Sequence, residues 1–393
     1  AYEICACRVG SEMCIRDRIL SCGTGGGHNA AGRAIMEELQ RRGHHAEMFN
    51  PYNLVSDRLA EEVDKLYIKM AQKTPRAFGF VYRLGNLYRK LPVKSPIYHV
   101  NKKMVPVLER YLAEHPADVI FMPHLYPAEI ITQMKKQGSS LPLTIFVATD
   151  YVCIPFTEET NCDYYVIPDE ELKDDFIKRG IPEEKLLPYG IPTSAAFSEE
   201  KSREEAKEEL GLQKDRHYLL ISGGSIGAGQ LCKAVRVLKR HYAGTDKELV
   251  VICGNNTTLY EELKREYAAD KDMVHILMHT DRMADYMKAC DVVLSKPGGL
   301  SSTEAAVSGT ALLHITPIPG CEILNMKFFG ERGMAVPVET IDARLGKICD
   351  KMLKEERYRR MADRQKQYIN PHSAADICDF AQKYASFAKN ISI

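Results

Sequence analysis

The sequence contains no apolar run long enough to cross a bilayer as a helix, and no secretory signal is recognisable in it. Its twelve cysteines are scattered, and their close pairs, Cys5 with Cys7 and Cys153 with Cys162, lack the repeated CxxC spacing of a zinc site. The first absence excludes a helical membrane span, and the second disfavours structural zinc. We therefore expect a cytoplasmic globular protein whose thiols are reduced.

Three common signatures of nucleotide sites are also missing. No GK[ST] follows the glycines of GTGGGH at residues 23–28, which excludes a Walker loop. Gly25, Gly27 and Ala30 match the G-x-G-x-x-A fingerprint of dinucleotide sites. The next strand, however, ends in Phe-Asn-Pro at residues 49–51, where that fingerprint requires an acid, so NAD is disfavoured. The glycine-rich loops carry no paired aspartates of the D-x-D kind that would hold a metal at a diphosphate, and we expect no metal cofactor.

The first eighteen residues show neither helical nor strand periodicity. They do not begin with methionine, and three of them are cysteines. The stretch SEMCIRDR within them resembles translated adapter or vector sequence. We interpret residues 1–18 as a non-native segment and expect the residues before Ile19 to pack poorly.

The net charge of zero hides an uneven distribution. Residues 65–104, the basic aromatic block, carry ten lysines or arginines, six aromatic residues and no acid. Such a block is attracted to anionic lipid, although a solvated helix face and nucleic acid remain alternatives. We favour membrane lipid over nucleic acid, through Lys69, Arg76, Phe78, Phe80, Tyr82, Arg83, Arg89 and Lys90.

After Ile19, short apolar runs alternate with amphipathic stretches, which is typical of an α/β protein with parallel sheets. A helix is expected from about residue 28 to residue 42, ended by Gly43. Ten runs read as strands: ILSC, AEMF, DVIFM, LTIFVA and YYVI in the first half, and HYLLIS, ELVVICG, VHILM, DVVLS and ALLHI in the second.

A chain of 393 residues favours two domains, so we predict two Rossmann-like halves that face one another across a cleft. The boundary is placed at GIPTSAAF, where Pro192 and Thr193 precede a run dense in Glu and Lys at residues 199–209. The predicted parts are an acceptor and membrane-docking domain at 19–193, a donor domain at 194–371, and a helix at 372–393 that crosses back to the first domain.

Four glycine-rich loops follow predicted strands: GTGGGH, SGGSIGAGQ, CGNN and KPGGLSSTEA. Ligands of doubly wound sheets bind at these strand ends, where helix N-termini attract phosphate. In the last loop Ser301, Ser302 and Thr303 are expected to cap a helix, and Glu304 can accept hydrogen bonds from a ribose. The pattern predicts a nucleotide site, followed by a sugar site near Cys321, Glu322 and Asn325.

These motifs carry a resemblance. The second-half motifs resemble the UDP-sugar domain of glycosyltransferases that include diacylglycerol sugar transferases and the peptidoglycan lipid glucosaminyltransferase. SCGTGGGHNAAGRA and VATDY in the first half resemble the diacylglycerol branch, which comprises monogalactosyldiacylglycerol synthases and processive diacylglycerol glucosyltransferases. The resemblance implies a GT-B fold with the reaction in the interdomain cleft.

The resemblance also implies site residues. Cys321 stands where the family often has glutamine. The acceptor loop would comprise Gly25, Gly26 and Gly27. The donor would be bound by Gly223, Gly224, Ser225, Gly254, Asn255, Lys296, Gly298, Gly299, Ser301, Thr303, Glu304, Gly320, Glu322 and Asn325.

Transfer to a lipid hydroxyl requires a base, and histidine, with an ordinary pKa of about 6.5, is suited to that task. His28 lies in the first turn of the predicted helix, where the helix dipole should lower its pKa and favour the neutral form. We predict that His28 is the general base and that Asp150 orients His28 or the acceptor.

The implied activity is inverting transfer of a hexose from UDP-glucose or UDP-galactose to diacylglycerol, by an enzyme bound peripherally at the inner face of the cell membrane. The alternatives are transfer to a polyprenyl-diphosphate lipid, a UDP-sugar epimerase, and a UDP-sugar sensor without turnover. The sequence indicates no oligomeric state.

Overall fold

The computed structural model describes residues 16–23, 26–62, 65, 94–225, 227 and 230–391. Two six-stranded parallel sheets form its frame, with strand orders β2-β1-β3-β4-β5-β6 and β12-β11-β10-β7-β8-β9. The first sheet comprises β1 (Arg16–Leu20), β2 (His45–Phe49), β3 (Val119–Met122), β4 (Leu143–Val147), β5 (Tyr164–Val166) and β6 (Leu186–Leu187). The second comprises β7 (His217–Ser222), β8 (Lys247–Ile252), β9 (Val274–Leu277), β10 (Val292–Ser295), β11 (Ala311–Ile315) and β12 (Val336–Val338).

Helices connect the strands. With the first sheet lie α1 (Gly26–Arg41), α4 (Pro96–Asn101), α5 (Val105–Glu114), α6 (Leu125–Lys136) and α7 (Lys173–Ile177). The second half contains α8 (Ala195–Ser198), α9 (Arg203–Leu210), α10 (Leu231–Tyr242), α11 (Thr257–Glu266), α12 (Met283–Ala289), α13 (Gly299–Val307), α14 (Cys321–Glu331), α15 (Arg344–Met352), α16 (Glu355–Tyr368) and α17 (Ser373–Ile391). Single 3₁₀ turns occur at Pro51–Leu54, Lys102–Met104, Thr157–Glu159, Glu170–Leu172 and Glu183–Lys185.

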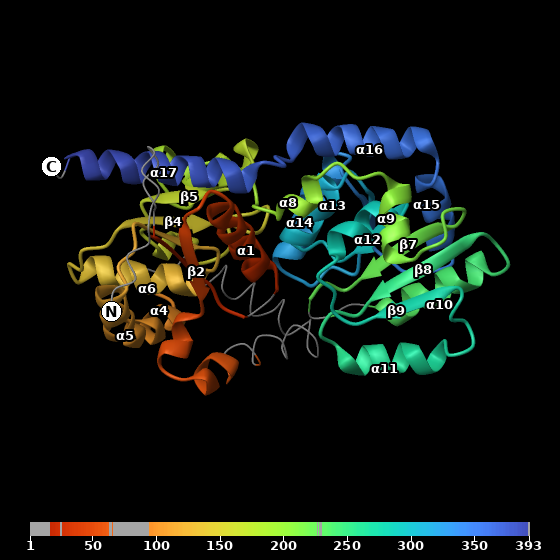
Figure 1. Ribbon diagram of the computed structural model, residues 1–393, viewed down its shortest axis with the longest axis horizontal. Coiled ribbons are helices and arrows are strands. Elements are labelled where there is room, and N and C mark those ends of the chain that lie inside the picture. The colour runs from red at the N-terminus through yellow and green to blue at the C-terminus, as the bar shows by residue number, and fades with distance from the viewer. Residues whose placement is uncertain are drawn as a thin grey trace.

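The two sheets lie side by side in Figure 1, and α17 lies along the first of them although it follows the whole second sheet in the chain. α17 contacts α1 and β4. Its Ile377, Cys378 and Ala381 are buried in one cluster with Ile35 and Leu39 of α1. This cluster covers one face of the first sheet, and a second cluster that includes α5 and α6 residues covers the other.

The core of the second sheet receives side chains from the first half of the chain. Ala31 of α1 and Tyr151, which follows β4, belong to the same buried cluster as β7, β8 and β10. Tyr151 packs against Phe328 and Phe329 of α14, with ring centroids 4.7 and 4.9 Å away. The halves therefore share apolar core as well as a cleft.

The predicted architecture is confirmed: all ten predicted strands are present, and the predicted helix after the first strand is α1, followed by Gly43 at φ 82°. Sequence reasoning missed β6 and β12, since two or three residues at a sheet edge are too short to show a period.

The expectation that residues before Ile19 pack poorly is wrong for residues 16–18. β1 begins at Arg16, Asp17 is fully buried, and Arg18 lies 3.6 Å from Glu47. The ladder with β2 runs from Arg16 opposite His45 to Leu20 opposite Phe49, because backbone pairing in a sheet does not require apolar side chains. Residues 1–15 lie outside the described residues.

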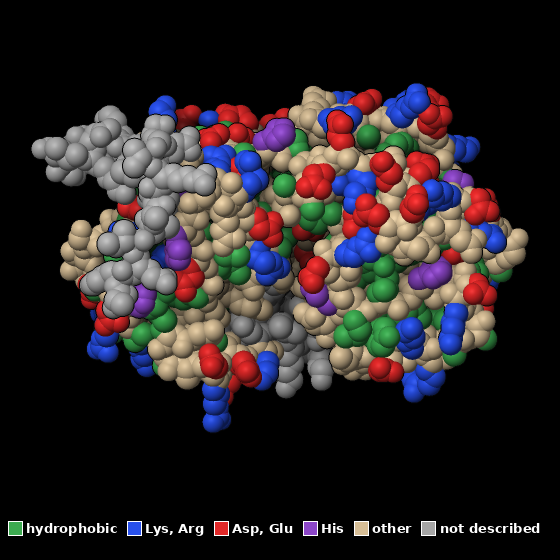
Figure 2. All heavy atoms as spheres, in the orientation of Figure 1, with side chains coloured by type: hydrophobic (Ala, Val, Ile, Leu, Met, Phe, Trp, Pro, Cys, Tyr) green, Lys and Arg blue, Asp and Glu red, His purple; other side chains and the backbone are tan. Residues whose placement is uncertain are grey.

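Other predicted residues also lie outside the described part: Gly25 and the membrane residues Lys69, Arg76, Phe78, Phe80, Tyr82, Arg83, Arg89 and Lys90. On the face shown in Figure 2, basic and acidic side chains are interspersed over the half that holds the second sheet. Among the described helices, none combines the length and apolar character that a bilayer span requires.

Candidate active site

A cleft with a volume of about 560 Å³ lies between the carboxyl ends of the two sheets. The first half contributes Gly26, Gly27, His28 and Asp150 to its lining. The second half contributes ten of the predicted donor residues: Gly223, Gly224, Ser225, Gly254, Lys296, Gly298, Gly299, Ser301, Glu304 and Glu322. The structure thus brings residues from all four glycine-rich loops to one cavity, and their binding roles remain predictions.

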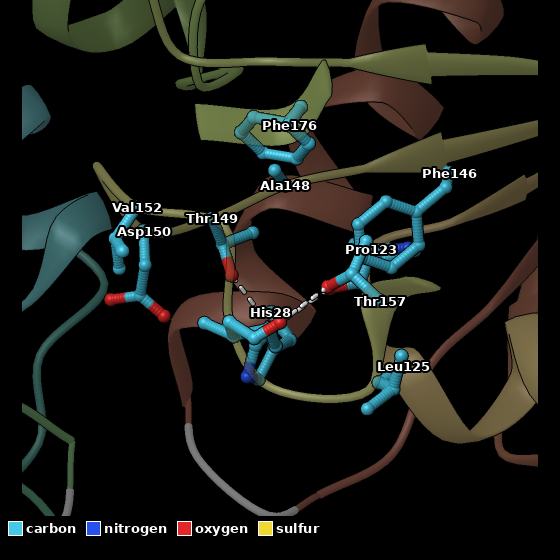
Figure 3. A pocket seen from close by; sticks show the side chains of 11 residues that line it. His28, Pro123, Leu125, Phe146, Ala148, Thr149, Asp150, Val152, Thr157 and Phe176 are labelled. Atoms are coloured by element: carbon cyan, nitrogen blue, oxygen red, sulfur yellow. Dashed lines mark hydrogen bonds between the residues drawn. The ribbon is translucent and has the colours of Figure 1, made fainter. Parts of the chain in front are cut away.

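His28 is the third residue of α1 and is held by two oxygen atoms from other elements (Figure 3). Its Nδ1 lies 2.8 Å from the Pro123 carbonyl oxygen and 2.8 Å from Thr149 Oγ1. A carbonyl only accepts, so Nδ1 carries the proton. In the neutral ring Nε2 is then the unprotonated nitrogen, which is the form a base requires.

The pKa of His28 is lowered, as predicted, although the largest cause is burial rather than the helix dipole, and the Pro123 hydrogen bond opposes it. Behind the ring lies a small cavity of about 10 Å³ with Phe146, Ala148 and Phe176 in its wall (Figure 3). Apolar surroundings disfavour the imidazolium because they replace its hydration. His28 is therefore neutral at pH 7.

A buried histidine, His124, lies beside His28. The rings of His28 and His124 meet edge to face with centroids 4.6 Å apart. Burial lowers the pKa of His124 well below its ordinary value, and the proximity of His28 lowers it further. His124 Nδ1 accepts a hydrogen bond from the Tyr126 backbone N–H at the start of α6. The pair is accordingly uncharged at neutral pH.

Asp150 does not take the predicted place beside the His28 ring. The hydrogen bonds of Nδ1 go to Pro123 and Thr149, and the Asp150 carboxylate accepts from Asn325 Nδ2 at 2.7 Å. Burial raises the pKa of Asp150 to about 6, while the Asn325 hydrogen bond opposes the rise. Asp150 still lines the cleft, so a contact with the acceptor remains a prediction.

The second-half wall carries charge. Lys296 Nζ, at the end of β10, lies 2.8 Å from Glu322 Oε1, and their side chains are only 9% and 12% exposed. The other oxygen of Glu322 accepts from the Ile318 backbone N–H at 2.7 Å. Glu304 is half-buried on α13, where burial raises its pKa to about 8 and the charge of Arg33 lowers it.

Two glycines permit the halves to approach closely. A Cβ at Gly299 would lie 1.9 Å from the Thr149 carbonyl oxygen. A Cβ at Gly26 would lie 2.5 Å from Ser225 Cβ, and the Gly26 backbone N–H donates to Ser225 Oγ at 2.9 Å. Both glycines were predicted to bind ligand, but in this structure they also serve as contact points between the halves.

Two predicted donor residues have other partners. Thr303 is buried, donates to the Gly299 carbonyl and contacts the Tyr151 hydroxyl at 2.8 Å. Asn325 is fully buried: Nδ2 donates to Asp150 and to the Pro297 carbonyl, and Oδ1 accepts from the Tyr151 N–H. These polar groups join the two halves, and their contacts with the donor remain predictions.

Smaller corrections concern the loops themselves. α13 begins at Gly299 with Gly298 as its N-cap, so Ser301, Ser302 and Thr303 lie inside the helix and do not cap it. Asn255 is exposed and donates its backbone N–H to the Ser225 carbonyl. Gly320 adopts φ 134° between two lining residues, Pro319 and Cys321, without being one itself.

Sequence reasoning missed several lining residues. Thr149, Arg33, His279 and Asp281 all border the cleft, and His279 Nε2 lies 3.3 Å from Asp281. Thr149 belongs to the quoted VATDY motif, which was the available signal. Arg33 belongs to the quoted SCGTGGGHNAAGRA motif, whereas His279 and Asp281 follow no motif and become visible only when the halves are placed together. No metal-binding group of three His, Cys, Asp or Glu residues occurs among the residues that the structure describes.

Comparison with known proteins gives matches to both halves. Residues 28–193 match the family model described as Monogalactosyldiacylglycerol (MGDG) synthase, and this match begins at His28. Residues 218–381 match the model described as Glycosyltransferase family 28 C-terminal domain, which spans every strand of the second sheet. Both halves therefore match glycosyltransferase families.

Individual proteins agree with these matches. The chain is 25% identical over 346 residues to the processive diacylglycerol beta-glucosyltransferase of Bacillus subtilis, covering 87% of this chain and 88% of that protein. Its fold is similar to Acinetobacter baumannii MurG, with TM-score 0.59, 16% identity, and 94% and 99% of the two chains covered. The S. aureus MnaA–UDP co-structure has TM-score 0.62 at 12% identity, covering 95% and 97%. These structures establish the two-domain GT-B fold.

Proposed function

We propose that this chain, whose first half matches the Monogalactosyldiacylglycerol (MGDG) synthase model and whose second half matches the Glycosyltransferase family 28 C-terminal domain model, transfers a hexose from a UDP-sugar to the free hydroxyl of diacylglycerol. The observation that carries the proposal is the position of His28. This neutral histidine, whose tautomer is fixed by the Pro123 carbonyl, borders the same cleft as the glycine-rich strand ends of the second half.

In the proposed reaction, Nε2 of His28 takes the proton of the acceptor hydroxyl as the hydroxyl oxygen attacks C1 of the sugar. The bond between C1 and the diphosphate oxygen breaks, and UDP leaves with the electron pair. Attack from the face opposite UDP converts an α-linked donor into a β-glycoside, so the transfer inverts configuration. The displacement is a single step without a covalent enzyme intermediate. His28 then releases the proton to solvent.

The second-half wall supplies the donor site in this proposal. The diphosphate lies at the N-terminus of α13 beside Gly298, where backbone N–H groups and the helix dipole favour negative charge. Glu304 accepts hydrogen bonds from the ribose. These groups are proposed to bind the leaving group without a metal ion.

Three finer parts of the function belong to the proposal as well. Glucose and galactose are both considered as the transferred hexose. The basic aromatic block is proposed to dock the enzyme on anionic lipid, because ten cations without an acid are attracted to it by about 1 kcal/mol per residue near the surface. The site of action is proposed to be the inner face of the cell membrane.

The test is radiolabelled transfer from UDP-glucose and from UDP-galactose, in parallel, to diacylglycerol in anionic mixed micelles, with and without EDTA. His28→Ala is compared with the parent chain, and UDP binding is measured for both. The matched control is His279→Ala, a cleft histidine that is given no chemical role.

Labelled glycolipid from one donor, lost in His28→Ala but retained in His279→Ala and in EDTA, supports the full proposal. UDP binding without any lipid product would overturn it in favour of a sensor or another acceptor. Conversion of the UDP-sugar to its epimer without lipid would indicate an epimerase.

A further inference from the structure

The loop after β4 touches the proposed base and the donor-side helix with a single residue. Thr149 Oγ1 lies 2.8 Å from His28 Nδ1, while the Thr149 carbonyl oxygen lies 1.9 Å from the position that a Cβ at Gly299 would take. Thr149 is 8% exposed. One residue therefore contacts the base through its hydroxyl and the first turn of α13 through its backbone.

The next two residues anchor this loop to the second half. The Tyr151 backbone N–H donates to Asn325 Oδ1 at 2.7 Å, and the Tyr151 hydroxyl lies 2.8 Å from Thr303 Oγ1. Asp150 accepts from the same Asn325 amide. These contacts fix the loop against α13 and α14, so the Thr149 hydroxyl is placed by the donor half although it acts on a histidine of the acceptor half.

We propose that Thr149 is a positioning residue: its hydroxyl, with the Pro123 carbonyl, orients the His28 ring and stabilises the positive charge that appears when His28 takes the acceptor proton. This inference rests on the proposed role of His28 as base. Many catalytic histidines are oriented by a carboxylate in the corresponding place. Here two neutral oxygens serve, and the Asp150 carboxylate is bonded to Asn325 instead.

The arrangement has a chemical reason. Nδ1–H lies within 2.8 Å of both oxygens, so the imidazolium keeps these partners after Nε2 is protonated. Neutral acceptors stabilise that cation less than a carboxylate would, which agrees with the lowered pKa of His28. Two other titratable groups lie nearby: His124 on the ring edge and Asp150 in the wall of the same small cavity.

The experiment compares Thr149→Val, which removes the hydroxyl at nearly constant volume, with Thr149→Ser, which keeps it. Measurements are kcat and KM for the UDP-sugar, the pH profile of kcat, and the affinity for UDP. For Thr149→Val we expect kcat to fall about 10-fold with KM and UDP affinity unchanged, and the acid limb of the profile to move to lower pH, because an acceptor that favours the imidazolium is lost. Thr149→Ser should keep the parental kcat and the parental acid limb of the pH profile.

A Thr149→Val enzyme with parental kcat and an unmoved acid limb, while His28→Ala is inactive, would overturn this inference and leave the proposed base in place. Full turnover in His28→Ala would instead overturn the base itself. If Thr149→Val loses UDP binding, the valine has disturbed the contact with Gly299. Thr149→Ala, which has a smaller side chain, then replaces Thr149→Val in the comparison with Thr149→Ser.

Discussion

The two walls of the cleft are built from different chemistry. On the first-half wall, His28 is hydrogen-bonded to a carbonyl and a hydroxyl, and it lines a small cavity together with Phe146 and Phe176. On the second-half wall, a mostly buried Lys296–Glu322 ion pair and Glu304 lie among glycine-rich strand ends. A general base must be neutral before it takes a proton, and apolar surroundings favour its neutral form. The diphosphate of a donor is an anion, and it is bound by positively charged groups and backbone N–H groups.

The largest expected effect tests the first wall. His28→Ala should lower kcat by about 10²- to 10⁴-fold, which is the usual contribution of a general base, and should leave UDP affinity unchanged because the donor lies on the other wall. Steady-state transfer assays and calorimetric titration with UDP measure the two quantities. A parallel loss of UDP affinity would contradict this division between the walls.

The next effect tests the second wall. At pH 9, where the Glu304 carboxyl is ionised, Glu304→Gln should weaken UDP binding by roughly 10- to 100-fold, since hydrogen bonds to a charged acceptor contribute about 1.5–3 kcal/mol. Calorimetric titration with UDP measures the loss, and Glu37→Gln, at another cleft-lining carboxylate, is the control. Equal losses in both variants would show a general charge effect rather than a ribose contact.

The same carboxyl group predicts a pH dependence. The pKa of Glu304 is raised to about 8, so much of it is protonated at pH 7 and ionised at pH 9. Only the carboxylate accepts from both ribose hydroxyls, and UDP affinity should therefore increase between pH 7 and pH 9. The increase should disappear in Glu304→Gln; a flat profile in the parent chain would refute this account.

A smaller effect concerns the line where the walls meet. Gly299→Ala would place a Cβ 1.9 Å from the Thr149 carbonyl oxygen and should reduce the free energy of unfolding by about 1–3 kcal/mol. Thermal unfolding measures it. The control is Gly27→Ala, whose Cβ would lie an ordinary 3.7 Å from Leu300 Cβ. Equal destabilisation of both variants would contradict the close contact between Gly299 and the Thr149 carbonyl oxygen.

The smallest effect is expected from Tyr151→Phe, which removes the hydrogen bond to Thr303 and leaves the packing on α14 intact. We expect a loss of about 1 kcal/mol in the free energy of unfolding. Denaturant unfolding monitored by circular dichroism is the measurement, and the exposed Tyr384→Phe serves as the reference. An unchanged midpoint would mean that this bond does not hold the halves together.

The walls also differ in how far the sequence could predict them. Glycines after apolar runs located three loops of the second wall, because strand ends of parallel sheets meet at one edge, but they gave no sign of the loop after β9 that holds His279 and Asp281. The contacts of the first wall join residues far apart in the chain: Thr149 to His28 across 121 positions, and Asn325 to Tyr151 across 174. No local pattern encodes such pairs, so the sequence could not predict the contacts of Thr149 with His28 or of Asn325 with Tyr151.

The course of α17 has a consequence for how the protein is made. Ile377, Cys378 and Ala381 complete the cluster over one face of the first sheet, yet the ribosome adds them only after all of the second sheet has been synthesised. Until then the apolar face of α1 is uncovered during translation. The first half is therefore synthesised first, but its core is completed last. A fragment that ends before residue 373 would be prone to aggregation.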